Sequence, residues 1–274
     1  MTYSTEALVS AAATATGNET RLSICRKPNG FSFALTSGNE LLTVAEARRE
    51  GEGSLTDEAA AIKQYFESLG IKIFDLTKTE IVAVTDNFAW VPEELYTQGM
   101  EHQYLSLVDP SSVAAAVYTE HNPNLKSRIV FSVNDSLLTA FKIALPGLVV
   151  TCQHAKLANQ TLASACGPDG MAVLHLRTDK ADVAVYNGGR YLMGRTLQVD
   201  GVESLIFDVL EIIKTLNVEN DRFRLLLCGD VSRESYAAIR PYFASVALYT
   251  GRPWTLSTDE LRHLHTYRHA LILS

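Results

Sequence analysis

Alternating apolar and polar positions near the start of both halves of the chain predict two antiparallel meanders. In the first half, apolar residues alternate on both sides of Pro28-Asn29-Gly30, and the pattern continues into residues 40–47. Asn-Gly between two alternating runs is a strong hairpin signal. The corresponding strands of the second half are 171–176, 181–186 and 190–198. Each half is therefore predicted to contain a three-stranded meander.

Helical periodicity follows each meander. Residues 57–69 have an apolar stripe, with Thr56 as the expected cap and Gly70 at the end. Residues 202–216 have a longer apolar stripe of the same kind. Strands and helices then alternate in both halves, which predicts an α/β protein built twice from similar elements.

The two ends of the chain are predicted from local composition. Residues 1–20, rich in Ala and Thr, are expected to form a flexible or helical lead-in. The apolar run 270–273 is expected to be a last strand.

Length and composition describe a globular protein that is large enough for two cores. The chain has 274 residues and 47% hydrophobic residues, and 24 basic against 31 acidic residues give a net charge of −7. The acidic excess predicts no nucleic-acid partner. No apolar run reaches about 18 residues, so no membrane span is expected. The four scattered cysteines, without a CxxC pair, predict reduced side chains and a cytoplasmic location.

The repeated order of meander, helix and alternating strands resembles the actin-like ATPase (ribonuclease-H-like) superfamily. That resemblance implies a duplicated fold of two mixed sheets flanked by helices, with halves at 1–160 and 161–274. More narrowly, the chain is similar to a bacterial family of unknown function from Bacteroidetes. The segments that carry this similarity are 22–33, 91–96 and 188–199. The narrower family brings no activity with it.

The superfamily resemblance also points to a phosphate loop at residues 175–185. The superfamily pattern is Asp-Ile-Gly-Gly-Gly-Thr-Thr-Asp-Val-Ala-Val, and it aligns with this segment without a gap. His175 stands at the leading Asp, and Arg177, Thr178 and Asp179 stand at the three glycines. Glycine lets backbone amides approach a phosphate, and an oxygen ligand holds Mg²⁺. The resemblance thus implies a degenerate nucleotide cleft.

A second superfamily motif, a strand that ends in two glycines, aligns with residues 225–232. Gly229 is kept, whereas Asp230 replaces the second glycine. Two interpretations stay open: a surviving nucleotide pocket, or a tight turn followed by a helix capped by Ser232. The candidate cofactor-binding residues of the degenerate cleft are His175, Arg177, Thr178, Asp179, Gly229 and Asp230.

Histidines near the C-terminus form the other candidate site. His263, His265 and His269 share faces at strand or helix spacing, and Asp259 or Glu260 offers a further metal ligand. Arg262 and Arg268 would repel a cation, so a solvated surface is the favoured interpretation and no metal is assigned.

No sequence motif assigns a catalytic residue, and the leading hypothesis is a non-catalytic protein. It would act as an actin-like binding or scaffolding module with a protein partner. Trp90 and Trp254 lie beside prolines in expected loops and would favour such a partner if they are exposed, although packing in the core is the favoured interpretation of these aromatics. The alternative is a divergent ATP-binding phosphotransferase or ATPase, for which ATP and Mg²⁺ would be the cofactors. The sequence leaves the oligomeric state open.

Overall fold

The computed structural model divides the protein into two compact units. It describes residues 1–10, 19–27, 29–110, 116–133, 136–165, 169–251, 253–257, 261 and 263–274. The first unit comprises Met1–Gln153, Pro253–Leu264 and Leu273, and the second comprises His154–Arg252, His265–Ile272 and Ser274. Because C-terminal segments belong to both units, the predicted halves 1–160 and 161–274 stay a prediction.

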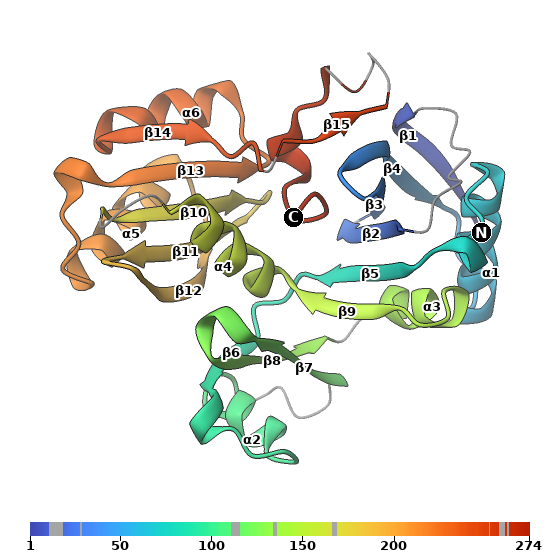
Figure 1. The fold of residues 1–274 in the computed structure, drawn as a ribbon, viewed down its shortest axis with the longest axis horizontal. Helices are drawn as coiled ribbons and strands as arrows, with labels where there is room; N and C mark the ends of the chain where they lie inside the picture. Colours follow the sequence, from blue (N-terminus) through green and yellow to red (C-terminus); the bar gives the residue numbers. More distant parts are fainter. Residues whose placement is uncertain are drawn as a thin grey trace. The chain divides into compact units, whose positions relative to one another are not determined.

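Strands and helices alternate along most of the chain (Figure 1). The elements of the first unit are β1 (Thr2–Ser10), β2 (Thr20–Lys27), β3 (Gly30–Ser37), β4 (Glu40–Glu50), α1 (Leu55–Ser68), β5 (Lys78–Ala83), β6 (Phe88–Pro92), α2 (Glu101–Ser106), β7 (Ala116–Asn122), β8 (Ser127–Val133), α3 (Ser136–Ala144), β9 (Val149–Cys152) and β15 (Thr255–Leu256). Those that follow β9 into the second unit are α4 (Gln153–Ser164), β10 (Met171–Leu176), β11 (Lys180–Asn187), β12 (Arg190–Gln198), α5 (Val202–Thr215), β13 (Arg224–Gly229), α6 (Arg233–Ile239) and β14 (Ser245–Leu248).

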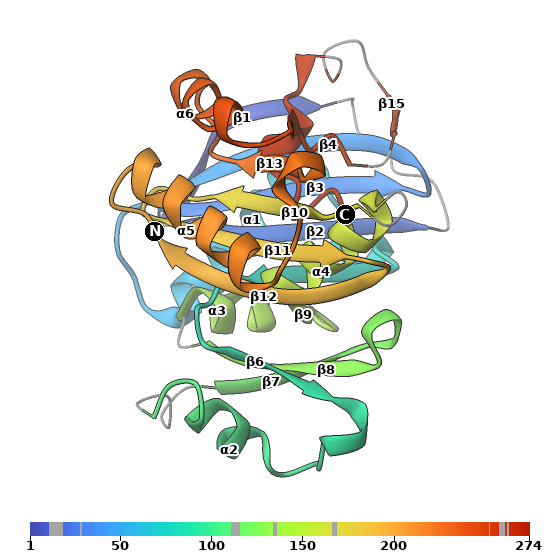
Figure 2. The same cartoon turned by 90° about the vertical axis from the view of Figure 1, so that its left-hand side faces the viewer.

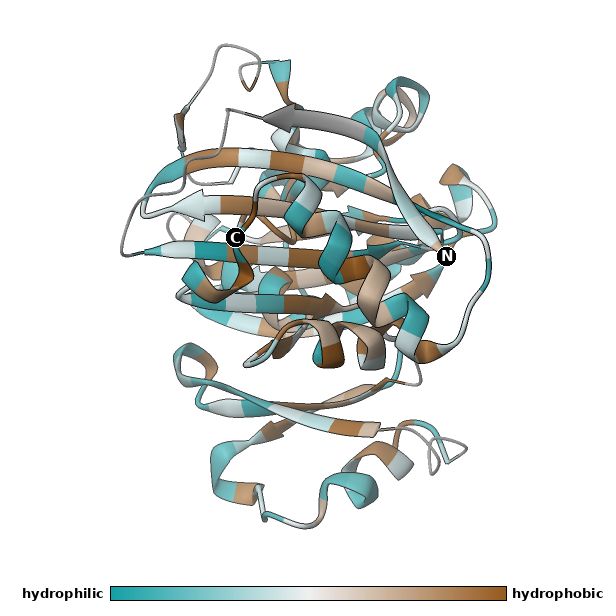
Figure 3. Ribbon diagram, turned by 90° about the vertical axis from the view of Figure 1, so that its right-hand side faces the viewer, coloured by the Kyte–Doolittle hydropathy of each residue, from teal (hydrophilic) through white to brown (hydrophobic). Residues whose placement is uncertain are grey.

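The first unit is built on a seven-stranded mixed sheet. Its order is β1-β4-β3-β2-β5-β9, and β15 pairs with β4. Apolar side chains of the sheet pack against α1 and α3, and the two helices contact each other. Both helices carry hydrophobic and hydrophilic stretches, as expected of helices that cover a sheet (Figure 3). Phe31 lies at the centre of this core, in edge contact with Tyr3, Tyr65 and Phe141.

The predicted hairpin of the first meander is confirmed. β2 and β3 are antiparallel, with Lys27 opposite Gly30, while Pro28 lies outside the described residues. Position 30 requires glycine for two reasons: its φ is 150°, and the neighbouring strand packs closely against it. A Cβ atom at this position would lie 1.9 Å from the carbonyl oxygen of Ala47 on the neighbouring strand.

The second unit contains a five-stranded mixed sheet of order β12-β11-β10-β13-β14. The second predicted meander, β10-β11-β12, is therefore confirmed. α5 crosses one face of this sheet (Figure 2). Leu205, Val209 and Ile213 of α5 are buried in one cluster with strand residues such as Leu174 and Val183. The predicted amphipathic helix thus forms the main cover of this face.

A small antiparallel sheet of order β6-β8-β7, together with α2, forms a three-stranded module within the first unit. Leu105 of α2 packs with Val91 and Val130 of the sheet. The carboxylate of Glu120 on β7 accepts hydrogen bonds from the Thr151 hydroxyl at 2.7 Å and the Cys152 amide at 3.0 Å. These bonds join the module to β9 of the large sheet.

Two sequence predictions at the chain ends are wrong. The expected lead-in contains strand β1, which pairs antiparallel with β4, whereas residues 11–18 lie outside the described residues. Tyr3 explains the strand, because its ring packs on Phe31 and Tyr65. The predicted last strand, 270–273, forms a turn after a 3-10 helix at Thr266–His269. Its apolar residues are buried, and burial alone does not distinguish a strand from a turn.

The start of α1 also differs from the prediction. Ser54, and not Thr56, is the cap: its hydroxyl accepts from the Asp57 amide, and the Asp57 carboxylate accepts from the Ser54 amide at 2.9 Å. This reciprocal pair is a capping box, so the helix begins at Leu55.

None of the helices in the described ranges is long and apolar enough to cross a membrane.

We predict that Gly30→Ala lowers the free energy of unfolding by more than about 2 kcal/mol, because the new Cβ would collide with the Ala47 carbonyl. Gly147→Ala is the matched control, since Gly147 has a φ of 78° and open space around it. The control should lose only about 1 kcal/mol from backbone strain. Urea unfolding of both variants measures the difference, and equal losses would contradict the packing argument.

Candidate functional site

A row of polar side chains crosses the second sheet on one face. Residues opposite each other on neighbouring strands point to the same side of a sheet. Thr196 on β12 lies opposite Asp182 on β11, Asp182 lies opposite His175 on β10, and His175 lies opposite Cys228 on β13. The other face of the same strands carries the apolar cluster under α5. The pleat therefore separates a polar row from the core.

The carboxylate of Asp182 is the centre of this row. It is fully buried, and its Oδ1 accepts hydrogen bonds from the Thr196 hydroxyl at 2.7 Å and from Nη2 of Arg177 at 2.9 Å. Nδ1 of His175 lies 3.4 Å from Oδ2. A buried carboxylate needs such partners, because an unpaired buried charge is strongly destabilising.

His154 on α4 adds a second imidazole to the cluster. Its Nε2 lies 3.0 Å from Oγ1 of Thr196 and 3.5 Å from Oδ1 of Asp182. The single hydroxyl proton of Thr196 is already donated to Asp182, so Nε2 of His154 must be the donor toward Thr196. This bond links α4 to the polar face of the sheet.

Opposing effects set the pKa of Asp182. Burial on its own raises it, whereas the hydrogen bond from His175 and the positive charges of His154, Arg177 and His175 lower it to about 2. The pKa of the Cys228 thiol is raised, first by burial and then by the negative charge of Asp182. The carboxylate is therefore charged at neutral pH, while the thiol is protonated and unreactive.

The predicted phosphate-loop residues form the turn between β10 and β11. The Arg177 amide donates to the Lys180 carbonyl at 2.8 Å, which closes the turn. Thr178 and Asp179 are exposed at its tip. The Asp179 carbonyl accepts from the Val199 amide and from the Gln198 side chain, both at 2.9 Å.

The other two candidate residues follow β13, which is parallel to β10. Gly229 has a φ of 82°, and a Cβ atom there would lie 2.2 Å from the Leu176 carbonyl oxygen. The Asp230 amide donates to that carbonyl at 2.9 Å. Ser232 then caps α6, as predicted, and its hydroxyl accepts from the Ser235 amide at 3.0 Å.

The structure thus brings His175, Arg177 and Gly229 to one end of β10 and β13, next to the exposed Asp230. Thr178 and Asp179 project from the turn without joining the buried cluster. Sequence reasoning missed His154 and Thr196 as members of the site and placed Asp182 only as a strand residue. Strand alternation supplied one signal: Asp182 is a charged residue between Ala181 and Val183 in an apolar run.

In the described part of the chain, no three His, Cys, Asp or Glu side chains form a set that could hold a metal ion. His263 and His265 are exposed, and the ring centres of His265 and Tyr267 lie 5.5 Å apart. Asp259, Glu260 and Arg262 lie outside the described residues.

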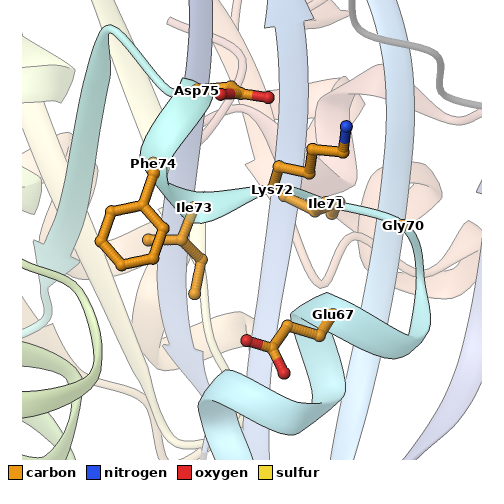
Figure 4. Close-up of a pocket in the computed structure, with 7 residues that line it drawn as sticks. All are labelled: Glu67, Gly70, Ile71, Lys72, Ile73, Phe74 and Asp75. Atoms are coloured by element: carbon orange, nitrogen blue, oxygen red, sulfur yellow. The ribbon is translucent and has the colours of Figure 1, made fainter.

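The first unit has a cavity of about 370 Å³ where α1 leads into β5. Glu67, Ile73 and Phe74 lie on one side of the connecting segment, whereas Lys72 and Asp75 point to the other (Figure 4). The Phe74 side chain is 84% exposed, with Nζ of Lys63 at 5.9 Å from its ring centre. The charged groups diverge, so this cavity lacks the converging polar set of a typical ligand site.

Solved structures identify the class of fold. A Bacteroides thetaiotaomicron VPI-5482 protein with an actin-like ATPase fold and unknown function matches at a TM-score of 0.70 with 18% identity, over 85% of this chain and 92% of that chain. A chain of the PilM–PilN type IV pilus biogenesis complex matches at a TM-score of 0.55 with 13% identity, over 93% of this chain and 97% of that chain. The protein therefore has the predicted actin-like ATPase fold, with two mixed sheets and an additional small sheet.

The family follows from the sequence. Residues 10–246 match the family described as "Protein of unknown function (DUF3822)", and the chain belongs to this family. No curated protein matches the sequence. The family of unknown function expected from the sequence is thereby identified, while its restriction to Bacteroidetes stays a prediction.

We predict that Asp182 makes stability depend on acid pH. Because its pKa is lower in the folded protein than the unfolded value near 3.9, the charged form stabilises the fold above that value. This contribution, about 2 kcal/mol, should be lost as the pH falls from 5 to 2. Asp182→Asn should flatten that part of the curve of unfolding free energy against pH.

Asp179→Asn is the matched control, because Asp179 is an exposed aspartate of the adjacent turn. Chemical unfolding at several pH values measures both curves. An Asp182→Asn curve parallel to that of the unmodified protein would contradict the assigned ion pairs.

Proposed function

We propose that the protein is a non-catalytic actin-like binding or scaffolding module, in which the former phosphate loop has a structural role. The observation that carries the proposal is the buried Asp182 cluster. The carboxylate of Asp182 is fully buried, and Arg177, from the loop itself, donates to it at 2.9 Å. A carboxylate held in this way is not available to a magnesium ion, which needs accessible oxygen ligands.

The backbone at this end of the sheet supports the same proposal. A phosphate site needs several amide groups that converge on the anion. Here the amide of Arg177 donates to Lys180 and that of Asp230 donates to Leu176. Amides that are already bonded within the protein would have to break those bonds to bind a phosphate.

The solved complex supports a binding role from a different direction. A protein with this fold lies in the PilM–PilN type IV pilus biogenesis complex. We therefore propose a protein partner for this chain as well, in place of a nucleotide cofactor. The alternative, a divergent ATP-binding phosphotransferase or ATPase, requires the loop to rearrange.

We predict that Mg²⁺–ATP leaves the thermal stability unchanged. A ligand at one hundred times its dissociation constant would stabilise the fold by about 2.7 kcal/mol. Differential scanning fluorimetry with Mg²⁺–ATP, followed by calorimetric titration, measures both stability and affinity.

Site variants distinguish a nucleotide site from incidental binding. Asp230→Ala removes an exposed candidate side chain, and Asp221→Ala removes an exposed carboxylate that is not a candidate. Micromolar Mg²⁺–ATP affinity that Asp230→Ala abolishes and Asp221→Ala preserves would overturn the proposal in favour of the enzyme.

A further inference from the structure

In the three-stranded module, large apolar side chains are exposed on the segment between β6 and β7. Leu107 is 85% exposed, Leu95 67% and Val108 55%. Leu107 and Val108 directly follow α2, one helical turn beyond Tyr104. Such exposure on neighbouring positions is typical of an interaction surface.

Aromatic contacts hold this surface in place. The Tyr104 hydroxyl donates to the Leu95 carbonyl at 2.9 Å and accepts from the Thr97 amide at 2.8 Å. The ring of Tyr104 stacks on the ring of Tyr96, with 6.1 Å between the ring centres. On Tyr96, the guanidinium of Arg128 lies 4.8 Å from the ring centre. The exposed leucine therefore projects from an ordered frame, which reduces the entropic cost of binding.

Exposed carboxylates flank the apolar side chains of the surface, while the cationic groups next to them are Arg128 over the Tyr96 ring and the imidazole of His121, whose Nε2 lies 3.3 Å from the Glu93 carboxylate. Between β6 and β7 the sequence has no Lys or Arg and four acidic residues: Glu93, Glu94, Glu101 and Asp109. Glu93 and Glu94 flank Leu95 and are exposed, and Glu101 starts α2. Glu101 accepts a hydrogen bond from Tyr96 at 2.5 Å, which lowers the pKa of Glu101 and keeps it charged.

We propose that the surface formed by Leu95, Leu107 and Val108, with its rim of Glu93, Glu94 and Glu101, binds a basic amphipathic segment of a partner protein. Apolar side chains of that segment cover the leucines, while Lys or Arg side chains meet the carboxylates. This inference rests on the proposed binding role and names the surface and the chemistry of the partner. Anionic membranes and nucleic acids are repelled by the same rim.

The test uses the full chain and a fluorescent peptide of about 18 residues, composed of Leu and Lys at amphipathic helical spacing. Fluorescence anisotropy measures its affinity. A peptide of the same composition in scrambled order and a Leu/Glu peptide are the ligand controls. We expect the amphipathic Lys peptide to bind most tightly and its affinity to fall with added salt.

Two pairs of variants locate the binding. Leu107→Ser with Val108→Ser should weaken binding at least about tenfold, whereas Phe207→Ser, at a 65% exposed side chain on α5, should not. Glu93→Gln with Glu94→Gln should weaken binding and reduce its salt dependence. The matched control is Glu203→Gln with Glu211→Gln, at exposed positions on α5. All substituted side chains are exposed, so circular dichroism should show the fold retained.

Several results would overturn the inference. Binding that the Leu107 and Val108 variant leaves unchanged, or equal binding of the Leu/Glu peptide, would remove the assigned surface. A dimer in sedimentation that Leu107→Ser dissolves would assign the surface to a second copy. Binding to phosphatidylserine vesicles that is lost in the same variant would assign it to a membrane. If the peptide fails and Mg²⁺–ATP also fails to bind, only the inference falls and the proposed non-nucleotide role stands.

Discussion

The buried carboxylate of Asp182 imposes a constraint that organises one end of the second sheet. A charge at that depth is tolerable only with several donors, and the chain supplies them from three elements. Thr196 comes from β12 and His175 from β10, whereas His154 of α4 donates to Thr196 and lies 3.5 Å from the carboxylate. Arg177 of the turn completes the set. The register of the meander, the position of α4 and the conformation of the turn are thereby coupled through one side chain.

The Asp182 cluster also determines the hydrogen bonding of the turn between β10 and β11, in which Arg177, Thr178 and Asp179 stand at the positions of the glycines in the superfamily pattern. In a glycine-rich loop, no side chains obstruct the backbone amides, which can point together at a phosphate. In this chain Arg177 turns back to neutralise Asp182, and its amide closes the turn onto Lys180. Gly229 is retained for another reason: the Leu176 carbonyl approaches too closely for any Cβ atom. A glycine that aligns with a nucleotide-binding motif can therefore serve the packing of strands and not the binding of a ligand.

The sequence predicts much of the fold, because both meanders and the helix 202–216 have strong local periodicity. Prediction from the sequence fails where contacts between distant residues determine the secondary structure. Strand β1 is an example, because it depends on the packing of Tyr3 against Phe31. The candidate site divides in the same way. Its loop residues align with a known pattern, but His154 reaches Thr196 across 42 positions, and no local spacing signals that contact. Interactions between distant residues set the chemistry of the site, so its partners become visible only in three dimensions.

In the three-stranded module, the contacts that hold the module together and attach it to the large sheet are separate from its exposed apolar side chains. Leu105 anchors α2 on the small sheet, and Glu120 ties β7 to β9 through Thr151 and Cys152. Neither anchor involves the exposed Leu107. The residues that hold the module together and attach it to the large sheet are thus distinct from the apolar residues that it exposes to solvent. Substitutions at the exposed positions therefore leave these attachments in place. Exposed side chains of the module can differ without disturbing Leu105 or Glu120, just as the buried Asp182 cluster stabilises the second sheet independently of the exposed turn residues Thr178 and Asp179.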